Sequence, residues 1–189
     1  MDPVFTGDLA WNVVRTLRDG TTCIVRPLLP ADRETLLRAF HEASAQTRYL
    51  RFGLATSSLT EDALTYLTEV DQRDHVAIGA VQGTRGIGVA RFVRSKKDPS
   101  CAEAAVAVVD DMQKKGVGRA LTTELARAAL ARGITRLHAD VLDANVTMRV
   151  ALQKLGAKPI PAETGDGLRA YELDLTAAAT TRDADQHGA

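Results

Sequence analysis

The sequence predicts an α/β protein of the α+β type, with a mixed, mostly antiparallel central sheet flanked by helices and a short N-terminal hairpin. Three β-rich runs, at residues 75–82, 87–94 and 101–109, follow one another without a helical pattern between them, which favours antiparallel neighbours. Apolar residues at helical spacing then dominate residues 117–132 and 145–155. Near the N-terminus, two short β-rich runs flank Arg18-Asp19-Gly20, which is typical of a hairpin turn.

Length and composition indicate one globular domain. With 189 residues, 45% of them apolar and 25% charged, the chain can bury a core without a metal or a disulfide. Basic and acidic residues balance at 24 each, which argues against a general nucleic-acid-binding protein. We find no signal peptide and no membrane-length apolar run, so we expect a cytoplasmic protein without a membrane partner. Cys23 and Cys101 lack metal-ligand spacing, so we expect buried free thiols and no metal.

The N-terminal half is expected to contain the hairpin and two helices before the sheet continues. The hairpin strands lie at residues 12–17 and 21–26, and two prolines, Pro27 and Pro30, close the second strand. Helical spacing of apolar residues predicts a helix over 31–43. Another helix is expected to begin after Thr60 as N-cap, with acidic residues in its first turn. We assign residues 1–20 to an N-terminal extension that includes the first hairpin strand.

The C-terminal half alternates helices and strands. The helix over 117–132 should end at Gly133 as C′ residue, and residues 134–142 should form the next strand. A helix starting at Asn145 and ending before Gly156 is expected to turn four side chains inward, those of Met148, Ala151, Leu152 and Leu155. Residues 157–160 and 168–175 are expected to be the last two strands. The domain then covers residues 21–175, and residues 176–189 are expected to be a disordered tail.

A glycine-containing segment, residues 110–121, joins the third β-rich run to the long helix. Gly116 and Gly118 let a ligand approach the backbone closely, and a helix N-terminus offers unpaired N–H groups at the positive end of the helix dipole. The segment therefore predicts an anion site, although glycine loops before helices often only turn the chain. It is not a P-loop, because Arg119 follows Gly118, and not a dinucleotide fingerprint, because Leu121 replaces the third glycine.

This segment reads Gln-x-x-Gly-x-Gly from Gln113 to Gly118 and resembles the pyrophosphate loop of the GCN5-related N-acetyltransferases (GNAT). Family members also commonly carry Asn-x-x-Ala-x-x-x-Tyr-x-Lys-x-Gly-Phe, of which Asn145, Lys154 and Gly156 keep their places. Three positions of that motif differ, namely Met148, Leu152 and Ala157. The resemblance covers about residues 21–175, and it implies the GNAT fold and transfer of an acetyl group from acetyl-CoA to an amine.

Residues 44–52 resemble the Ser-x-x-Ser/Thr-x-Tyr-x-Arg-Phe segment of bacterial protein lysine acetyltransferases, and residues 102–106 look like their Ala-Glu-x-Ala-Phe strand. Two arginines and two aromatic residues crowd into five positions of this segment, and we expect Tyr49, Arg51 and Phe52 to help wall an acceptor site. The alternative is a short helical turn whose rings pack on the core while its arginines reach solvent. Because these two segments resemble protein lysine acetyltransferases, a protein lysine is the expected acceptor, with an aminoglycoside, a polyamine or an amino acid as alternatives. We expect a monomer or a homodimer.

The resemblance also implies roles for single residues. Glu103 is the candidate general base because it is a lone carboxylate in a strand otherwise made of Ala and Val, whose apolar side chains would raise its pKa; the alternative is an ordinary surface charge. The pantetheine would lie near Val108, Val109 and Asp110, where an N–H of Val108 or Val109 polarises the thioester. The pyrophosphate would bind amides of the run Gln113, Lys114, Lys115, Gly116, Val117, Gly118, Arg119 and Ala120. The basic side chains of that run lie near the 3′-phosphate or only form a solvated helix start. Asn145 contacts the cofactor or only caps its helix.

Leu152 departs from the family pattern, because a tyrosine commonly stands there and protonates the departing thiolate. Water, another group such as Tyr49 or Tyr66, or unassisted departure must replace it. Leucine at this position also keeps open an acyl-CoA-binding regulatory module without turnover. His75 and His138 are expected to be structural. We expect direct transfer in a ternary complex rather than through an acetylated Cys101.

Overall fold

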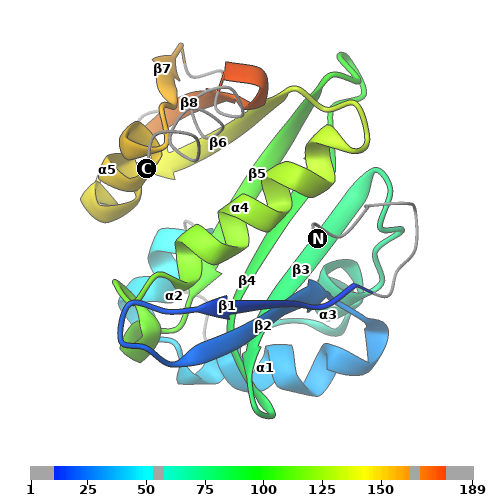
Figure 1. Ribbon diagram of the computed structural model, residues 1–189, viewed down its shortest axis with the longest axis vertical. Helices are drawn as coiled ribbons and strands as arrows, with labels where there is room; N and C mark the ends of the chain where they lie inside the picture. Colours follow the sequence, from blue (N-terminus) through cyan, green and yellow to red (C-terminus); the bar gives the residue numbers. More distant parts are fainter. Residues whose placement is uncertain (1–10, 53–57, 162–166, 178–189) are drawn as a thin grey trace, which may run out of the picture.

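The structure is a computed structural model that describes residues 11–52, 58–161 and 167–177, with the side chains of residues 51 and 52 left outside the description. Its centre is an eight-stranded sheet in the order β1-β2-β3-β4-β5-β6-β8-β7 (Figure 1). The strands are β1 (Val13–Thr16), β2 (Thr22–Pro27), β3 (His75–Gln82), β4 (Arg85–Arg94), β5 (Cys101–Val108), β6 (Arg136–Leu142), β7 (Lys158–Ile160) and β8 (Leu168–Asp174). Neighbours pair antiparallel except β5 and β6, which run parallel. The predicted mixed, mostly antiparallel sheet is confirmed.

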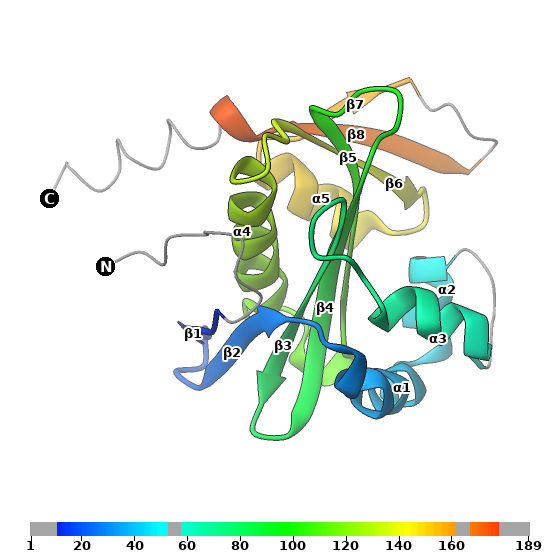
Figure 2. The same cartoon turned by 90° about the vertical axis from the view of Figure 1, so that its right-hand side faces the viewer.

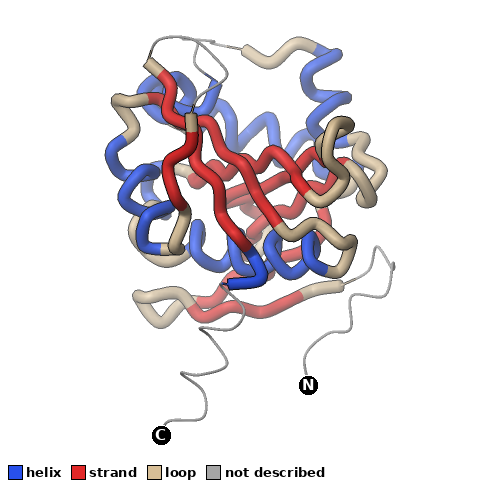
Figure 3. The backbone as a smooth tube through the Cα atoms, turned by 90° about the horizontal axis from the view of Figure 1, so that it is seen from above, coloured by secondary structure: helices blue, strands red, loops and turns tan. Residues whose placement is uncertain are grey.

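Helices cover both faces of this sheet (Figure 2). On one face lies α4 (Val117–Leu130); on the other lie α1 (Arg33–Glu42), α2 (Ala45–Phe52) and α3 (Glu61–Thr68), while α5 (Val146–Lys154) packs beside β6 and β8. Figure 3 shows the same sheet from above, with helices around its twisted strands. The inner side of α4 is buried against the sheet through Leu121, Leu125, Ala128 and Ala129, as predicted. None of the described helices is long and apolar enough to cross a bilayer.

The predicted helix ends are confirmed. The Thr60 hydroxyl accepts a hydrogen bond from the Ala63 N–H at 3.2 Å, which caps α3. Gly133 and Gly156 follow α4 and α5 with φ angles of 75° and 89°, in the left-handed region that ends helices and favours glycine. Asn145 caps α5 by accepting a hydrogen bond from the N–H of Met148 at 3.1 Å.

Two expectations need correction or stay open. Ala151 was expected to face inward but is exposed, and no residue of α5 is fully buried. The reason is that α5 covers only the end of the sheet, where Met148 and Leu152 pack against the small cluster of Val141, Ala157 and Tyr171. Residues 1–10 and 178–189 lie outside the described residues, so the N-terminal extension and the C-terminal tail stay predictions.

The sheet opens in its middle. β5 pairs with β6 only over Cys101–Glu103, opposite residues 136–138, and the two strands then diverge (Figure 1). Beyond that point no described strand pairs with the β6-facing edge of residues 104–108 or the β5-facing edge of residues 139–142. We call the space between these two edges the wedge. Its open side faces the first turn of α4, and its closed end is at Glu103.

Candidate active site

The wedge is lined by backbone groups of β5. The Val109 N–H donates to the Ile87 carbonyl at 3.2 Å, so Val109 belongs to the set of β5 residues that bond to β4. Hydrogen-bonding direction alternates along an antiparallel pair, so the N–H and C=O groups of Val106 and Val108 point away from β4 and into the wedge. An extended ligand that carries amides can pair with such an edge as an added strand does. Of the two predicted thioester donors, Val109 is therefore engaged with β4, and Val108 faces the wedge.

The glycine loop ends at the first turn of α4. Gly116 is the N-cap residue, with a φ of 102°, a conformation that glycine adopts without strain. The N–H groups at the two ends of the predicted anion-binding run are already used: Gln113 donates to the Asp110 carbonyl at 3.2 Å, and Ala120 donates to the Gly116 carbonyl at 3.0 Å. The candidate donors are thereby narrowed to the amides of residues 114–119, at the positive end of the helix dipole.

The N-terminal hairpin braces this loop from one side. The Arg18 N–H donates to the Lys115 carbonyl at 2.9 Å, and the Arg18 guanidinium donates to the Lys114 carbonyl at 3.3 Å. The Lys115 ammonium lies 3.6 Å from the Asp19 carboxylate. Two loop carbonyls are therefore held by the hairpin, which fixes the orientation of the peptide groups next to them.

Beside the brace lies an open hollow of about 430 Å³, lined by Arg15, Arg18, Arg119 and the first turns of α4. Arg15 is paired with the buried carboxylate of Glu124. Arg18 and Arg119 therefore supply most of the positive charge that this hollow offers to an anion such as a phosphate. Of the predicted basic residues, Arg119 lines the hollow and Lys115 pairs with the hairpin.

Two side chains of the segment tie it to the start of α2. The Asp110 carboxylate accepts hydrogen bonds from the Ser44 N–H at 2.9 Å and from the Ser44 and Thr47 hydroxyls, each at 2.8 Å. Burial works against the charged form, but these hydrogen bonds outweigh it and lower the pKa of Asp110. The Gln113 amide donates to the Val108 carbonyl at 3.2 Å and to the Thr47 hydroxyl at 3.3 Å. Sequence reasoning missed this tie, because its partners are far apart in the chain.

A second cavity, of about 100 Å³, lies between the α1–α2 helices and the face of strands β3 to β5. Its lining is mostly apolar and includes Phe40, Thr47, Arg48, Ala107 and Val108. The Arg48 guanidinium sits 5.5 Å from the centre of the Phe40 ring, a cation–π arrangement that holds α2 against α1. Because Val108 borders both this cavity and the wedge, ligands in the two spaces would meet at the end of β5.

Of the three predicted acceptor-site residues, only Tyr49 has a described side chain, and it is not among the residues that line this cavity. Tyr49 of α2 is 41% exposed, and the side chains of Arg51 and Phe52 lie outside the described residues. Tyr66, the other tyrosine considered as an acid, is 57% exposed and packs against His75 in a tilted arrangement, with 4.9 Å between ring centres. In the described part of α2, the residues that reach the cavity are Thr47 and Arg48.

Glu103 lies at the closed end of the wedge, in register with His138. Its side chain is exposed, so the expectation that apolar neighbours surround it was wrong. The reason is strand alternation: the side chains of Ala102 and Ala104 point to the opposite face, where α4 packs. Glu103 shares its face with Ala107, which lines the acceptor-side cavity. Its carboxylate is therefore open to solvent on the same sheet face as that cavity.

Asn145 and Leu152 have structural roles that the geometry makes explicit. The side-chain oxygen of Asn145 is occupied as the N-cap of α5, which confirms the capping alternative. Leu152 is partly buried and packs in the cluster around Val141 and Tyr171. A leucine at this position adds apolar contact and brings no proton donor to the wedge.

Comparison with known proteins identifies the same family that the sequence motifs resemble, and the match covers most of the chain. A family model for the acetyltransferase (GNAT) domain matches residues 23–158. "Acetyltransferase Pat" of Mycolicibacterium smegmatis is 38% identical over 143 residues, which are 75% of this chain and 43% of that protein. The chain thus spans less than half of the length of this relative.

Solved structures agree with the sequence relatives. The GNAT domain of S. lividans PAT superposes with a TM-score of 0.82 at 31% identity, covering 87% of this chain and 97% of that one. YncA of Salmonella typhimurium, whose structure contains its cofactor acetyl-CoA, gives a TM-score of 0.66 at 18% identity, covering 81% of this chain and 94% of that one. The second likeness concerns the fold alone.

Proposed function

The chain belongs to the GNAT acetyltransferase family, and from this premise we propose that it transfers the acetyl group of acetyl-CoA to the side-chain amine of a protein lysine. One observation carries the proposal: the backbone edge of β5 over residues 104–108, with which no described strand pairs on that side, runs along the wedge toward the first turn of α4. Coenzyme A has an amide-bearing arm that ends in a diphosphate, so it matches such an edge followed by a helix N-terminus. The lysine acceptor is supported by the resemblance of residues 44–52 to protein lysine acetyltransferases.

In the proposed complex the pantetheine amides pair with the backbone of Val106, the Val108 N–H faces the thioester, and the diphosphate accepts hydrogen bonds from amides of residues 114–119. Arg18 and Arg119 then lie beside the 3′-phosphate. The acceptor lysine enters through the cavity bordered by Thr47 and Arg48 of α2, and the Asp110 carboxylate holds Thr47 in place. The thioester and the amine would meet near Val108, which borders both spaces.

The chemistry needs a base, because a lysine amine with a pKa near about 10.4 is mostly protonated at neutral pH. Glu103 lies five residues before Val108, about 16 Å along the strand, so it accepts that proton through a chain of water molecules, and the amine nitrogen attacks the thioester carbonyl. The Val108 N–H donates to the carbonyl oxygen as negative charge develops on it. The carbon–sulfur bond then breaks, and the thiolate leaves and takes a proton from solvent, because Leu152 offers none.

The base is tested with Glu103→Gln, which keeps the shape of the side chain and removes the proton acceptor. We expect the rate of thiol release with a lysine peptide to fall by about 10²–10⁴-fold, while the KM for acetyl-CoA changes little. Glu61→Gln is the matched control, since its side chain is 86% exposed on α3, and it should keep full turnover. Unchanged turnover in Glu103→Gln would exclude the base role and leave the family assignment in place.

A second candidate is an acyl-CoA-binding module with weak turnover, and the packed position of Leu152 favours it. Thiol release measured against lysine peptides, aminoglycosides, polyamines and amino acids separates the alternatives. Release with lysine peptides supports the proposed transferase, and release with small amines alone replaces the protein acceptor. Tight binding of acetyl-CoA without release in any arm supports the module.

A further inference from the structure

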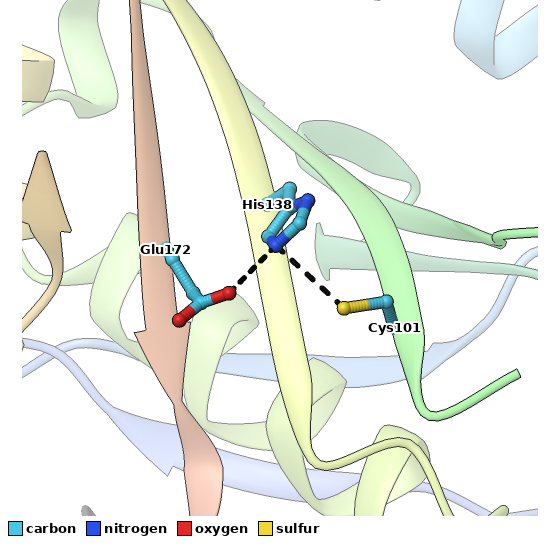
Figure 4. A group of neighbouring side chains, drawn as sticks. All are labelled: Cys101, His138 and Glu172. Atoms are coloured by element: carbon cyan, nitrogen blue, oxygen red, sulfur yellow. Dashed lines mark hydrogen bonds and ion pairs between the residues drawn. The ribbon is translucent and has the colours of Figure 1, made fainter. Parts of the chain in front are cut away.

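Three side chains that the proposed transfer reaction does not use gather on the sheet face opposite α4 (Figure 4). Cys101 begins β5, His138 lies in β6 and Glu172 lies in β8. His138 is in register with Glu172 on one side and with Glu103 on the other. Cys101 precedes Glu103 by two positions and therefore points to the same face. Three adjacent strands thus bring a thiol, an imidazole and a carboxylate together.

The three donor atoms converge on one point. Cys101 Sγ lies 3.6 Å from His138 Nε2, and the same nitrogen lies 2.9 Å from Glu172 Oε2; all three atoms are within 4.8 Å of one another. A ring nitrogen carries at most one proton. If Nε2 is protonated, it donates a hydrogen bond to the carboxylate and has no lone pair left to accept one from the thiol. If it is not, it accepts from the thiol and turns a lone pair toward the carboxylate. A cation between the three atoms satisfies all of them.

The same geometry argues against a catalytic thiol triad. In such a triad the imidazole uses one ring nitrogen for the nucleophile and the other for the carboxylate. Here the sulfur and the carboxylate approach the same nitrogen. Cys101 is also only 4% exposed, which limits access of a thioester to its sulfur. The arrangement fits shared coordination better than proton relay.

We propose that Cys101, His138 and Glu172 bind a zinc ion. Zinc takes thiolate, imidazole and carboxylate ligands at about 2.0–2.3 Å in a tetrahedron, and neighbouring strands offer a rigid frame for such a set. The thiol of Cys101 releases its proton to solvent when the metal binds. His138 and Glu172 keep 40% and 30% of their side chains exposed, which leaves room for water as the fourth ligand.

One cation already lies near this site. A guanidinium nitrogen of Arg136 is 3.6 Å from Glu172 Oε2, and the other end of the group is paired with Asp98. The Asp98 carboxylate offsets the charge of Arg136, so the local balance still admits a divalent ion. Bound zinc would clamp β5, β6 and β8 together at the closed end of the wedge, two residues from Glu103. The proposed zinc site is independent of the transfer reaction, so a test of zinc binding can succeed or fail whether or not the chain transfers acetyl groups.

The test uses the full chain, freed of metal with a chelator and then titrated with zinc by calorimetry and with cobalt(II) by absorption. We expect one ion per chain, a thiolate-to-cobalt charge-transfer band in the near ultraviolet, and an upward shift of the unfolding midpoint in zinc. Cys101→Ser should lose the band. His138→Asn and Glu172→Gln should each weaken zinc binding by more than about 100-fold, because loss of an outer-shell partner alone costs about 10–100-fold.

The controls are the other cysteine and a histidine remote from the cluster. Cys23→Ala should keep the cobalt band, and His41→Asn, at an exposed position of α1, should keep the zinc affinity. Glu172→Gln sits at a partly exposed position, so it remains informative even if Cys101→Ser fails to fold. The absence of a band in the parent protein, or equal zinc affinity in the parent and in His138→Asn, would overturn the site.

Discussion

Glu124 lies on the inner side of α4 with none of its side chain exposed. Its Oε1 accepts a hydrogen bond from Arg15 Nε of β1 at 3.0 Å, and the Arg127 guanidinium is 3.6 Å away. Among the described residues, its other oxygen has no hydrogen-bond partner. A carboxylate is tolerated in such a place only when it is paired, so this ion pair fastens the first strand to α4.

We therefore expect Arg15→Ala to lower the free energy of unfolding by about 3 kcal/mol, the lower end of the range for breaking a buried pair, because the more distant Arg127 still offsets part of the Glu124 charge. Urea unfolding followed by circular dichroism measures the change. Glu124→Gln in the Arg15→Ala background should recover part of the loss, since it removes the uncompensated charge.

The matched control for this substitution is Arg169→Ala. Arg169 pairs with Asp143 at the surface, where the two side chains are 53% and 47% exposed, and such pairs contribute little to stability. An equal loss of unfolding free energy in Arg15→Ala and Arg169→Ala would show that the buried ion pair contributes no more to stability than the surface pair.

Gly116 and Gly133 lie at the two ends of α4. Gly116 belongs to the proposed diphosphate loop and Gly133 only ends the helix, so substitutions at the two positions separate an effect on ligand binding from an effect on stability. Both have positive φ angles, 102° and 75°, which cost an alanine on the order of 1–2 kcal/mol. An added Cβ at Gly116 would lie 3.6 Å from Arg18 Cγ, an ordinary contact, and at Gly133 it would meet nothing within 4 Å. Backbone strain, and not collision, is therefore the common effect of both substitutions.

We expect both Gly116→Ala and Gly133→Ala to reduce stability, and only Gly116→Ala to weaken acetyl-CoA binding. Relief of the strain at Gly116 tilts the amides that follow it, which are the proposed diphosphate donors. The Kd should rise by about tenfold, equivalent to about 1.4 kcal/mol, in calorimetric titration. Equal affinity in the two variants would place the diphosphate away from this loop.

Elements marked by local chemistry could be predicted from the sequence. Thr60 and Asn145 act through hydrogen bonds to residues three positions away, and Gly133 and Gly156 through their own backbone angles, so each signal is contained in a short window. The inward face of α5 was predicted wrongly at Ala151, because helical spacing shows which side is apolar and not how much of that side the sheet covers. The surroundings of Glu103 were misjudged for a similar reason: residues adjacent in a strand face opposite sides of the sheet.

Features that depend on how distant segments meet were not accessible from the sequence. The wedge exists because the pairing of β5 with β6 stops after Glu103. The sequence of neither strand contains a signal that predicts where the pairing stops. The cluster of Cys101, His138 and Glu172 likewise depends on the register of three strands. Single cysteine, histidine and glutamate residues spaced over most of the C-terminal half carry no recognisable ligand spacing. The family resemblance supplied the expected location of the cofactor site, and the topology describes the shape of the space at that location.

The wedge as a whole predicts an alternating pattern of amide exchange along β5. The amides of Ala105 and Ala107 belong to the set that bonds to β4, so they should exchange slowly with or without ligand. The amides of Val106 and Val108 face the wedge and should exchange fast in the free protein. Acetyl-CoA should slow exchange at Val106 and Val108 alone, because its arm pairs with that edge.

Hydrogen–deuterium exchange followed by NMR resolves these neighbouring amides. Ile78 serves as the reference, since β3 is paired on both sides by β2 and β4 and its protection should not respond to ligand. Protection that rises equally at all four β5 amides would indicate general tightening of the sheet instead of strand-like pairing. Protection that changes nowhere on β5, with acetyl-CoA bound at saturation, would place the arm outside the wedge. The alternating response follows from the hydrogen-bonding direction of β5, so it tests the cofactor position without relying on catalysis.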